Sequence, residues 1–235
     1  MPDTSLPRVE RAGDFTLALD ASTYRGTVAV LGGARVLAER EVAMKSADAE
    51  RLMPAVAEAL AEAGVAVGAL ARVVCGEGPG SFTSLRIAGA IAKGIATAQD
   101  IPLYAVSSLF LIAAAASPPL DEGAWLCVSD AMRGDCYATD VYVTEHGVLV
   151  HETSARMVRP ADFDGERAHT KRIVGPNVAG VDREAWPHAR GVAADLVRLL
   201  GERPVDLDAW EPSYGRLAEA QVKWEAAHGR PLAGA

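Results

Sequence analysis

The segment from Gly76 to Ile87 constrains the fold of this chain more than any other stretch. Three glycines and a proline stand between an apolar run at 73–75 and a long apolar run at 85–98. This order predicts a strand, a tight loop and the start of a helix, because glycine tolerates left-handed dihedrals and close backbone approach. Ser81 is expected to cap that helix, since its hydroxyl can accept a hydrogen bond from an N–H group one turn further on.

The chemistry of this loop is open between two interpretations. Backbone N–H groups at a strand-to-helix junction can bind a phosphate or another anion. The loop lacks the Gly-Lys-Ser/Thr of a Walker A motif, and Ser81 stands where a dinucleotide fingerprint has its third glycine. Pro79 also removes one N–H donor. Spacing alone therefore favours the second interpretation, a structural turn that packs the helix against the strand.

Composition limits the compartment and the partners. The chain has 235 residues, half of them hydrophobic, and 23 basic against 31 acidic residues give a net charge of −8. Proteins that grip nucleic acid alone usually present a basic face, so tight RNA binding by this chain alone is not expected. Residues 1–14 contain no apolar core of a signal peptide, and prolines interrupt the longest uncharged stretch at 101–120. We expect a cytoplasmic protein with no membrane segment, and Cys75, Cys127 and Cys136 as buried free thiols.

The order of apolar runs predicts an internal duplication. An Asp-Ala pair ends an apolar run at Asp20 and again at Asp130, and each is followed by an Arg-Gly pair and another strand-like run. Each half is therefore expected to open with a three-stranded meander, which indicates two lobes. The predicted strands are 15–21, 26–31, 35–42, 72–76, 102–106, 125–130, 135–143, 148–157 and 172–174. The predicted helices are 48–63, 81–98, 107–116, 191–200 and 215–227, with loops at 156–171 and 204–212.

The two long helices of the first half have unusually wide apolar arcs. A surface helix needs an arc of only about 100° to face its own core. One side of each helix can cover the sheet, and the other side needs a second cover. Another helix of the same chain or a foreign subunit could provide it, and the sequence leaves both open. The apolar residues that would bind a partner are Leu52, Met53, Val56, Leu60, Phe82, Leu85, Ile87, Ile91 and Ile95.

Catalytic groups are sparse. The five histidines include no metal-binding pair, and Ser81 lacks an obvious histidine partner, so surface or turn positions are expected for the histidines. Asp20 and Asp130 could hold a magnesium-bound water if a nucleotide lay between the lobes, or they could simply cap turns. The residues of a possible nucleotide or loop site are Asp20, Ser22, Thr23, Gly78, Gly80, Ser81, Thr83 and Arg86.

Motifs along most of the chain resemble those of the TsaB (YeaZ) family. GEGPGSFTSLRIA at 76–88 is similar to the family signature GxGPGSFTGLRIG, and LALDAST at 17–23 to its first strand, LALDTST. AERLMP at 49–54 resembles HAERLLP, and the stretch from Ile101 to Leu109 resembles IPVVGVSSL. DAMRGDCY at 130–137 resembles DARRGEVY, and EPSYGR at 211–216 resembles EPVYLR. Ser84 and Ala88 replace two glycines of the signature.

The resemblance implies a two-lobed α/β fold of the actin-like ATPase superfamily, with a mixed sheet flanked by helices in each lobe. It implies lobes at 15–106 and 107–213 and a C-terminal helix and tail at 214–235. It further implies a non-catalytic accessory subunit in the synthesis of tRNA threonylcarbamoyladenosine, paired through its first two helices with the catalytic paralogue TsaD. The segment 46–50 contains no histidine of the kind that holds the paralogue's metal.

The resemblance leaves further points open. A small ATPase, TsaE, is expected to bind the pair. ATP and magnesium are expected to bind only to the complex, and this chain is expected to contact tRNA only through the complex. The isolated chain could be a monomer or a homodimer formed through the same helices. The rival hypothesis is a nucleotide hydrolase or sugar-type kinase that acts alone and uses Asp20 and Asp130.

Overall fold

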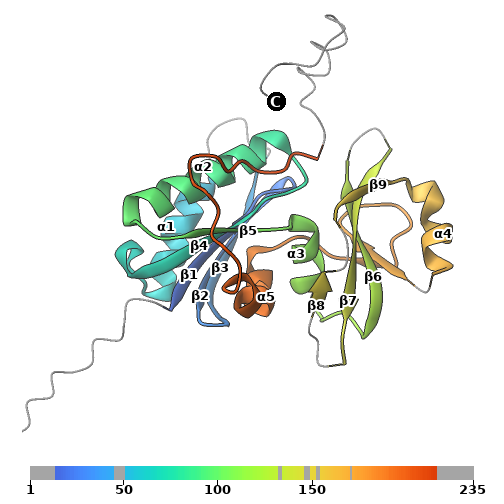
Figure 1. Cartoon of the computed structure of the whole chain (residues 1–235), viewed down its shortest axis with the longest axis horizontal. Helices are drawn as coiled ribbons and strands as arrows, with labels where there is room; N and C mark the ends of the chain where they lie inside the picture. The colour runs from blue at the N-terminus through green and yellow to red at the C-terminus, as the bar shows by residue number, and fades with distance from the viewer. Residues whose placement is uncertain are drawn as a thin grey trace, which may run out of the picture.

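Two mixed β-sheets organise the chain, with helices between them and on their outer faces (Figure 1). The structure is a computed structural model that describes residues 14–44, 51–131, 134–145, 149–151, 154–169 and 171–215. The start of the helix expected at 48, Arg133, the hairpin turn at 146–147 and the last helix beyond Gly215 lie outside the described residues.

The first sheet has the strand order β3-β2-β1-β4-β5. Its antiparallel meander consists of β1 (Phe15–Asp20), β2 (Arg25–Gly32) and β3 (Arg35–Ala43), and β4 (Leu70–Gly76) and β5 (Leu103–Val106) join in parallel with β1. Helices α1 (Leu52–Ala63) and α2 (Phe82–Gln99) pack on one face of this sheet, and a short 3-10 turn, η1 (Val67–Ala69), precedes β4. The predicted strands and helices of this half are confirmed to within a few residues.

The second sheet repeats the first in strand order and direction. It has the order β11-β10-β6-β7-β8, and β9 also pairs with β7. Its strands are β6 (Gly123–Asp130), β7 (Cys136–Val143), β8 (Leu149–His151), β9 (Arg156–Val158), β10 (Arg172–Gly175) and β11 (Arg183–Glu184). β6 runs antiparallel to β7 and parallel to β10, as β1 does to β2 and β4. This shared topology confirms the predicted duplication.

Two predictions for the second half were wrong. The single strand expected at 148–157 is instead two separate strands, β8 and β9. Residues 156–171 were expected to form a loop, but they contain β9, the 3-10 turn η2 (Pro160–Asp162) and the short helix α4 (Phe163–Arg167). The segment has a polar sequence because α4 packs on the outer face of the second sheet through only one large side chain, Phe163. One buried aromatic residue produces no helical period that a sequence pattern could detect.

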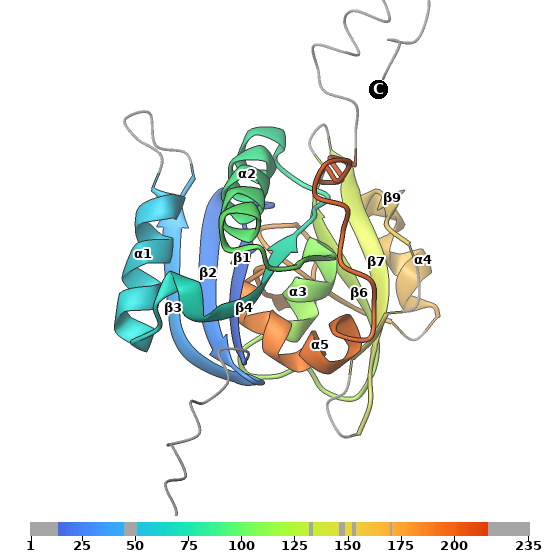
Figure 2. The ribbon, with the colours of Figure 1, turned by 60° about the vertical axis from the view of Figure 1, so that its left-hand side comes forward.

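The main core lies between the two sheets. Helix α3 (Ser108–Ala114), the 3-10 turn η3 (Ala189–Gly191) and helix α5 (Val192–Leu199) fill this space (Figure 2). The side chains from Leu109 to Ile112 are all at most 1% exposed, which explains the long uncharged stretch of the sequence. Sheets, central helices and outer helices together form the arrangement expected from the sequence, two lobes that each contain a mixed sheet flanked by helices. Among the described helices, none is long and apolar enough to cross a bilayer.

Residues 203–215, here called the strap, return from α5 to the first sheet (Figure 2). The backbone N–H of Val205 donates to the carbonyl of Leu103 at 2.9 Å, and that of Ser213 donates to the carbonyl of Glu77 at 2.6 Å. Lys93 of α2 donates to the carbonyl of Trp210 at 3.0 Å. One flank of α2 is therefore covered by an extended segment of the same chain and not by a further helix.

Candidate protein-interaction site

The glycine-rich loop after β4 uses its backbone donors within the chain. The N–H of Glu77 donates to the carbonyl of Val106 at 2.9 Å, and that of Gly78 donates to Ser108 Oγ at 3.0 Å. The N–H of Ser81 donates to the carbonyl of Ser22 at 2.7 Å. An anion nest needs N–H groups that point outward together. This geometry supports the structural-turn interpretation of the loop.

Asp20 lies at the end of β1 and is completely buried. Its Oδ1 accepts hydrogen bonds from the Ser22 backbone N–H at 3.1 Å and from Ser22 Oγ at 2.9 Å. Its Oδ2 accepts one from Ser108 Oγ at 2.5 Å. Burial raises the pKa of this carboxyl, although the hydrogen bonds from Ser108 and Ser22 oppose the rise. The carboxyl therefore joins β1, the glycine-rich loop and the first turn of α3.

Two glycines permit this close approach. A Cβ atom at Gly76 would lie 2.0 Å from Asp20 Oδ2, and one at Gly80 would lie 2.0 Å from the carbonyl oxygen of Ser22. Real Cβ atoms essentially never lie within 3.0 Å of another heavy atom, so the loop or the atoms that it contacts would have to move. The glycines are explained by packing of the loop on the Asp20–Ser22 turn, without a ligand.

The helix start after the loop differs from the expected cap. Ser81 occupies the N-cap position of α2, but its side chain accepts no hydrogen bond from the helix backbone. Its Oγ lies instead 3.0 Å from Ser84 Oγ. Ser84, which stands where the resembled signature has a glycine, is buried. Its hydroxyl forms a hydrogen bond with that of Ser81, in place of the bond that Ser81 would otherwise accept from the helix backbone.

The remaining residues of the possible nucleotide site lie in different local surroundings. Thr83 and Arg86 are exposed on α2. Thr23 Oγ1 accepts a hydrogen bond from the N–H of Arg25 at 3.1 Å in the turn before β2. Asp130 is exposed at the end of β6, whereas its counterpart Asp20 is buried. The two strand-end carboxylates thus have different surroundings.

The nine apolar residues expected to bind a partner divide into two groups. Five of them are at most 8% exposed: Leu52, Val56, Leu60, Leu85 and Ile95. All of these except Leu85 pack in the core between the helices and the first sheet. The other four reach the surface. Met53 is 46% exposed and Phe82 38%, and Ile87 and Ile91 are half-buried.

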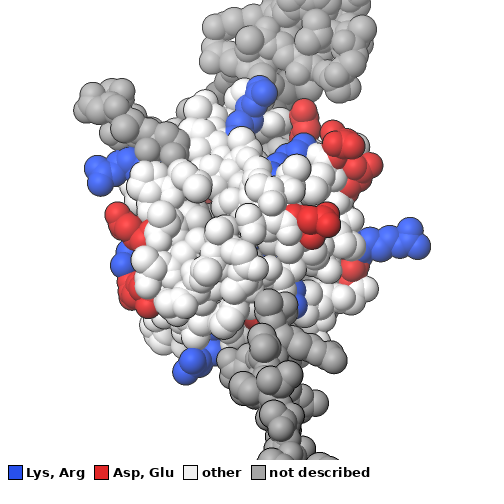
Figure 3. All heavy atoms as spheres, turned by 90° about the vertical axis from the view of Figure 1, so that its left-hand side faces the viewer, with Lys and Arg blue, Asp and Glu red and all other residues white. Residues whose placement is uncertain are grey.

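The surface members lie on a face with little charge. Met53, Ala57 and Ala61 of α1, together with Ile87, Ala90, Ile91 and Gly94 of α2, form what is called here the α1–α2 face. Figure 3 looks onto the side of the molecule where these helices lie and shows a broad area without charged side chains, with charges along its margin. On α1, Glu58 and Glu62 form ion pairs with Arg40 of β3. An uncharged apolar face of this kind is typical of a protein-interaction surface.

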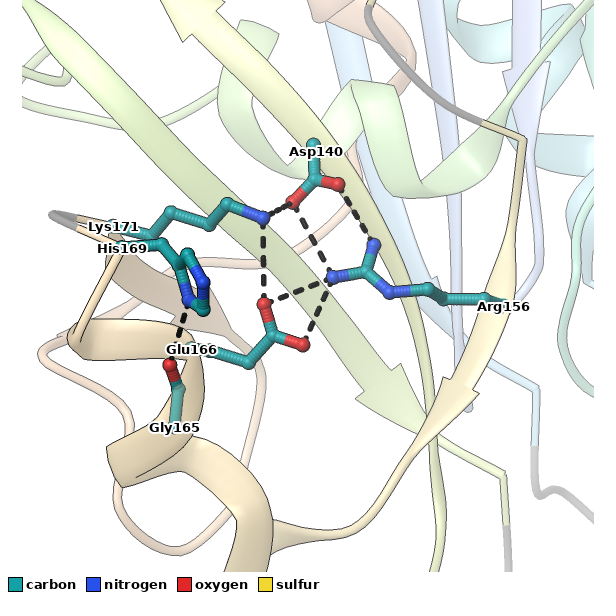
Figure 4. A network of polar contacts seen from close by, with 6 residues as sticks. All are labelled: Asp140, Arg156, Gly165, Glu166, His169 and Lys171. Carbon is teal, nitrogen blue, oxygen red and sulfur yellow. Dashed lines mark hydrogen bonds and ion pairs between the residues drawn. The ribbon is translucent and has the colours of Figure 1, made fainter.

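A second polar cluster lies on the outer face of the second sheet (Figure 4). Asp140 of β7 accepts from Lys171 Nζ at 2.7 Å and from Arg156 Nη1 at 2.9 Å. Glu166 of α4 accepts from Arg156 Nη2 at 3.0 Å and from Lys171 Nζ at 3.3 Å. Two acids and two bases thus neutralise one another and tie α4 and β9 to β7. Sequence reasoning missed this cluster, because its members are up to 31 residues apart.

Metal chemistry finds no support in the part of the chain that the structure describes. No three His, Cys, Asp or Glu side chains gather there in a way that could hold a metal ion. His188 is buried at the start of η3, where its Nδ1 accepts from the N–H of Arg190 at 3.0 Å. Burial, helped by the charge of Arg190, lowers the pKa of His188 to about 4. This histidine is a neutral capping group within a turn.

Comparison with known proteins agrees with the fold and the motifs. A family model described as TsaD, tRNA N6-adenosine threonylcarbamoyltransferase, matches residues 40–169. The chain is 32% identical over 226 residues to the tRNA threonylcarbamoyladenosine biosynthesis protein TsaB of Bacillus subtilis, covering 88% of this chain and 96% of that protein. It is 29% identical over 195 residues to the TsaB of Escherichia coli, with 79% of each chain covered.

Two solved structures share most of this arrangement. One is a Pseudomonas aeruginosa protein described as similar to peptidase YeaZ, with a TM-score of 0.72, 26% identity, and coverage of 86% of this chain and all of that one. The other is YeaZ from Pseudomonas aeruginosa, with a TM-score of 0.70, 25% identity and coverage of 86% and 99%. Fold and motifs together define a class of two-lobed α/β proteins with a mixed sheet in each lobe. Within that class, the chain belongs to the TsaB (YeaZ) family of tRNA threonylcarbamoyladenosine biosynthesis proteins.

Proposed function

We propose that this chain is a non-catalytic accessory subunit in the synthesis of threonylcarbamoyladenosine in tRNA. It pairs through the α1–α2 face with a TsaD-like catalytic paralogue, and a TsaE-like ATPase joins the pair. Threonylcarbamoyl transfer to the tRNA adenosine takes place on the paralogue, in the cytoplasm. The net charge of −8 supports contact with tRNA only through the complex.

The observation that carries this proposal is a face without charge on which Met53 is exposed and Ile87 and Ile91 are half-buried. Hydrophobic side chains that stay in water contribute nothing to folding, whereas their burial against a partner is favourable by about 25 cal/mol per Å² of apolar surface. Obligate interfaces are more hydrophobic than the rest of a protein surface. The face therefore fits a lasting subunit contact better than a transient encounter.

The rival proposal, a nucleotide hydrolase or kinase acting alone, has weaker support. It needs a strand-end carboxylate free to reach a metal-bound water and loop donors free to reach phosphate. The two oxygens of Asp20 already accept three hydrogen bonds, and burial disfavours its charged form. Calorimetric titration of the isolated chain with ATP and magnesium discriminates, and tight binding would favour the rival.

Co-purification of the full-length chain with its catalytic paralogue tests the pairing. Ile91→Glu and Met53→Glu each place a charge on the α1–α2 face, and both are expected to abolish co-purification. Val197→Glu is the matched control, because Val197 is 85% exposed on α5, away from that face. Val56→Arg is unsuitable, since Val56 is 1% exposed and an arginine there would disrupt the core.

A circular dichroism melt of each variant shows whether the isolated chain stays folded. If both folded face variants retain the paralogue as well as Val197→Glu does, the proposed surface is wrong.

A further inference from the structure

Two positive charges lie at the α2 margin of the α1–α2 face. Arg86 and Lys93 share one line of the helix with Ala90, an exposed member of that face, because these positions follow one another at spacings of four and three residues. The seven residues from Arg86 to Lys93 place their Cα atoms about 10 Å apart along the helix. A partner that covers Ala90 therefore comes within reach of both side chains.

Neither charge is neutralised by an ion pair with a described residue. Arg86 is exposed and Lys93 is half-buried, and neither contacts a carboxylate in the part of the chain that the structure describes. On the α1 margin, by contrast, Glu58 and Glu62 both form ion pairs with Arg40. The α2 margin thus has two unmatched positive charges, although the whole chain has a net charge of −8. Covered by an apolar partner without a counter-charge, these cations would oppose the pairing.

The strap holds both cations in position. The guanidinium carbon of Arg86 lies 5.3 Å from the centre of the Phe82 ring, which is within the range of a cation–π contact. The ring of Tyr214, at the end of the strap, lies 4.5 Å from that of Phe82 and supports it. Lys93 Nζ donates to the strap carbonyl of Trp210 at 3.0 Å, which leaves two of its three hydrogens for other acceptors. Because ordered side chains lose less entropy on binding, both cations are preorganised for an external acceptor.

We propose that Arg86 and Lys93 bind two carboxylates of the catalytic paralogue when its apolar surface covers the α1–α2 face. This inference rests on the proposed function and adds the chemistry of the partner, which has an apolar centre and two acidic side chains about 10 Å apart on the side that faces the strap. Carboxylates complement both cations, and the planar guanidinium of Arg86 can bind one through two parallel hydrogen bonds. Charges at the rim of an interface speed association and fix its orientation, while the apolar centre supplies most of the affinity.

Phosphate groups of tRNA are the other anions that these two cations could bind. Proteins that hold nucleic acid by themselves usually present a basic face, because each phosphate that is neutralised adds to a salt-dependent affinity. Here only two unmatched cations border a broad uncharged surface, on a chain with a net charge of −8 (Figure 3). This setting favours a protein partner over a nucleic acid.

The affinity of the full-length chain for the paralogue, measured at low and at high salt, tests the proposal. Arg86→Glu reverses one charge, and Lys93→Gln removes the other but keeps a side-chain donor for the carbonyl of Trp210. Arg159→Glu is the matched control, because it changes the net charge as much as Arg86→Glu does. The Arg159 side chain is 68% exposed and lies on the second lobe, away from the α1–α2 face. Circular dichroism melts verify that each variant is folded.

The expected result at about 50 mM salt is roughly tenfold weaker pairing for Arg86→Glu and about threefold weaker pairing for Lys93→Gln, with no change for Arg159→Glu. At about 500 mM salt the variants should approach the wild-type affinity, because screening limits surface charges to a reach of a few ångströms. The loss at low salt should appear mainly in the association rate.

Wild-type affinity in both variants overturns the proposal, and so does an equal loss in Arg159→Glu. A loss that persists at high salt also overturns it, because packing and not charge would then be responsible. So does normal pairing combined with weaker tRNA binding by the complex, or with altered self-association of the isolated chain, since the cations would then serve phosphate or a second copy. Failure of the proposed function is distinct, because the wild-type chain itself would then not bind the paralogue.

Discussion

The hydroxyl of Ser108 donates a hydrogen bond of 2.5 Å to the buried carboxylate of Asp20, and this contact joins the end of β1 to the first turn of α3. Ser108 Oγ also accepts from the N–H of Gly78, so the same pair holds the glycine-rich loop. In this chain the strand-end aspartate therefore has a structural role, and the first prediction concerns its removal.

Asp20→Ala leaves the Ser22 N–H and the Ser108 hydroxyl without their acceptor inside the protein. Each orphaned buried group costs about 1–3 kcal/mol of the free energy of unfolding. Asp20→Asn keeps an acceptor for Ser22 and a polar group beside Ser108, and it buries no charge, so its loss should be smaller. Urea unfolding of both variants measures the difference, and an Asn variant as unstable as the Ala variant would contradict this role.

Gly80→Ala should destabilise the protein severely, because its Cβ would lie 2.0 Å from the carbonyl oxygen of Ser22. Gly94→Ala is the matched control, since nothing lies within 4 Å of an added Cβ there and Gly94 is exposed within α2. Alanine in a helix interior is favoured over glycine by about 0.5–1 kcal/mol, so this control should be slightly stabilising. Thermal melts of the two variants should therefore shift in opposite directions, and a shared direction would argue against the close packing of the loop.

The cluster around Asp140 should make part of the stability depend on acid pH. Asp140 is buried, which alone would raise its pKa, but the hydrogen bond from Lys171 and the charges of Arg156 and Lys171 lower the pKa overall. A carboxyl whose pKa is lower in the folded state contributes stability above its unfolded value of about 3.9, and this contribution is lost as pH falls through the folded value. Wild type should exceed Asp140→Asn in free energy of unfolding at neutral pH.

The gap between the two proteins should begin to narrow below about pH 4, where the carboxyl becomes protonated in the unfolded chain, and it should close once the pH has fallen below the lower pKa of the folded chain. Urea unfolding from pH 7 to pH 3 checks this dependence, with Asp164→Asn as a control because the Asp164 side chain is 98% exposed. A gap that stays constant over this range would mean that the charge of Asp140 is not what stabilises β7 and α4.

The sequence predicted well which strands and helices follow one another along the chain, because these elements depend on local periodicity. It predicted the apolar residues of α1 and α2 without separating Val56, which is core, from Met53, which is surface. A wide apolar arc has two sides, and only the sheet and the strap determine which side is covered. The cover that Trp210 and Pro212 provide on α2 comes from more than a hundred positions further along the chain and has no local signal.

The candidate site shows the same limit. Asp20 and Asp130 are matched in the sequence, yet one is buried behind Ser108 and the other is exposed. The hydroxyl of Ser81 was expected to cap α2, and a competing contact with Ser84 prevents it. In each case a tertiary contact between side chains changed a role that local sequence rules had suggested.

Threonylcarbamoyl transfer to tRNA, reconstituted from the catalytic paralogue and variants of this chain, tests most directly whether the chain contributes a surface and not an active site. The account predicts that Ile91→Glu abolishes product formation together with pairing, whereas Asp20→Asn, which keeps the α1–α2 face, supports transfer at the wild-type rate once its folding has been verified. Loss of transfer with Asp20→Asn in a stably formed pair, or full transfer with a folded Ile91→Glu variant, would contradict it.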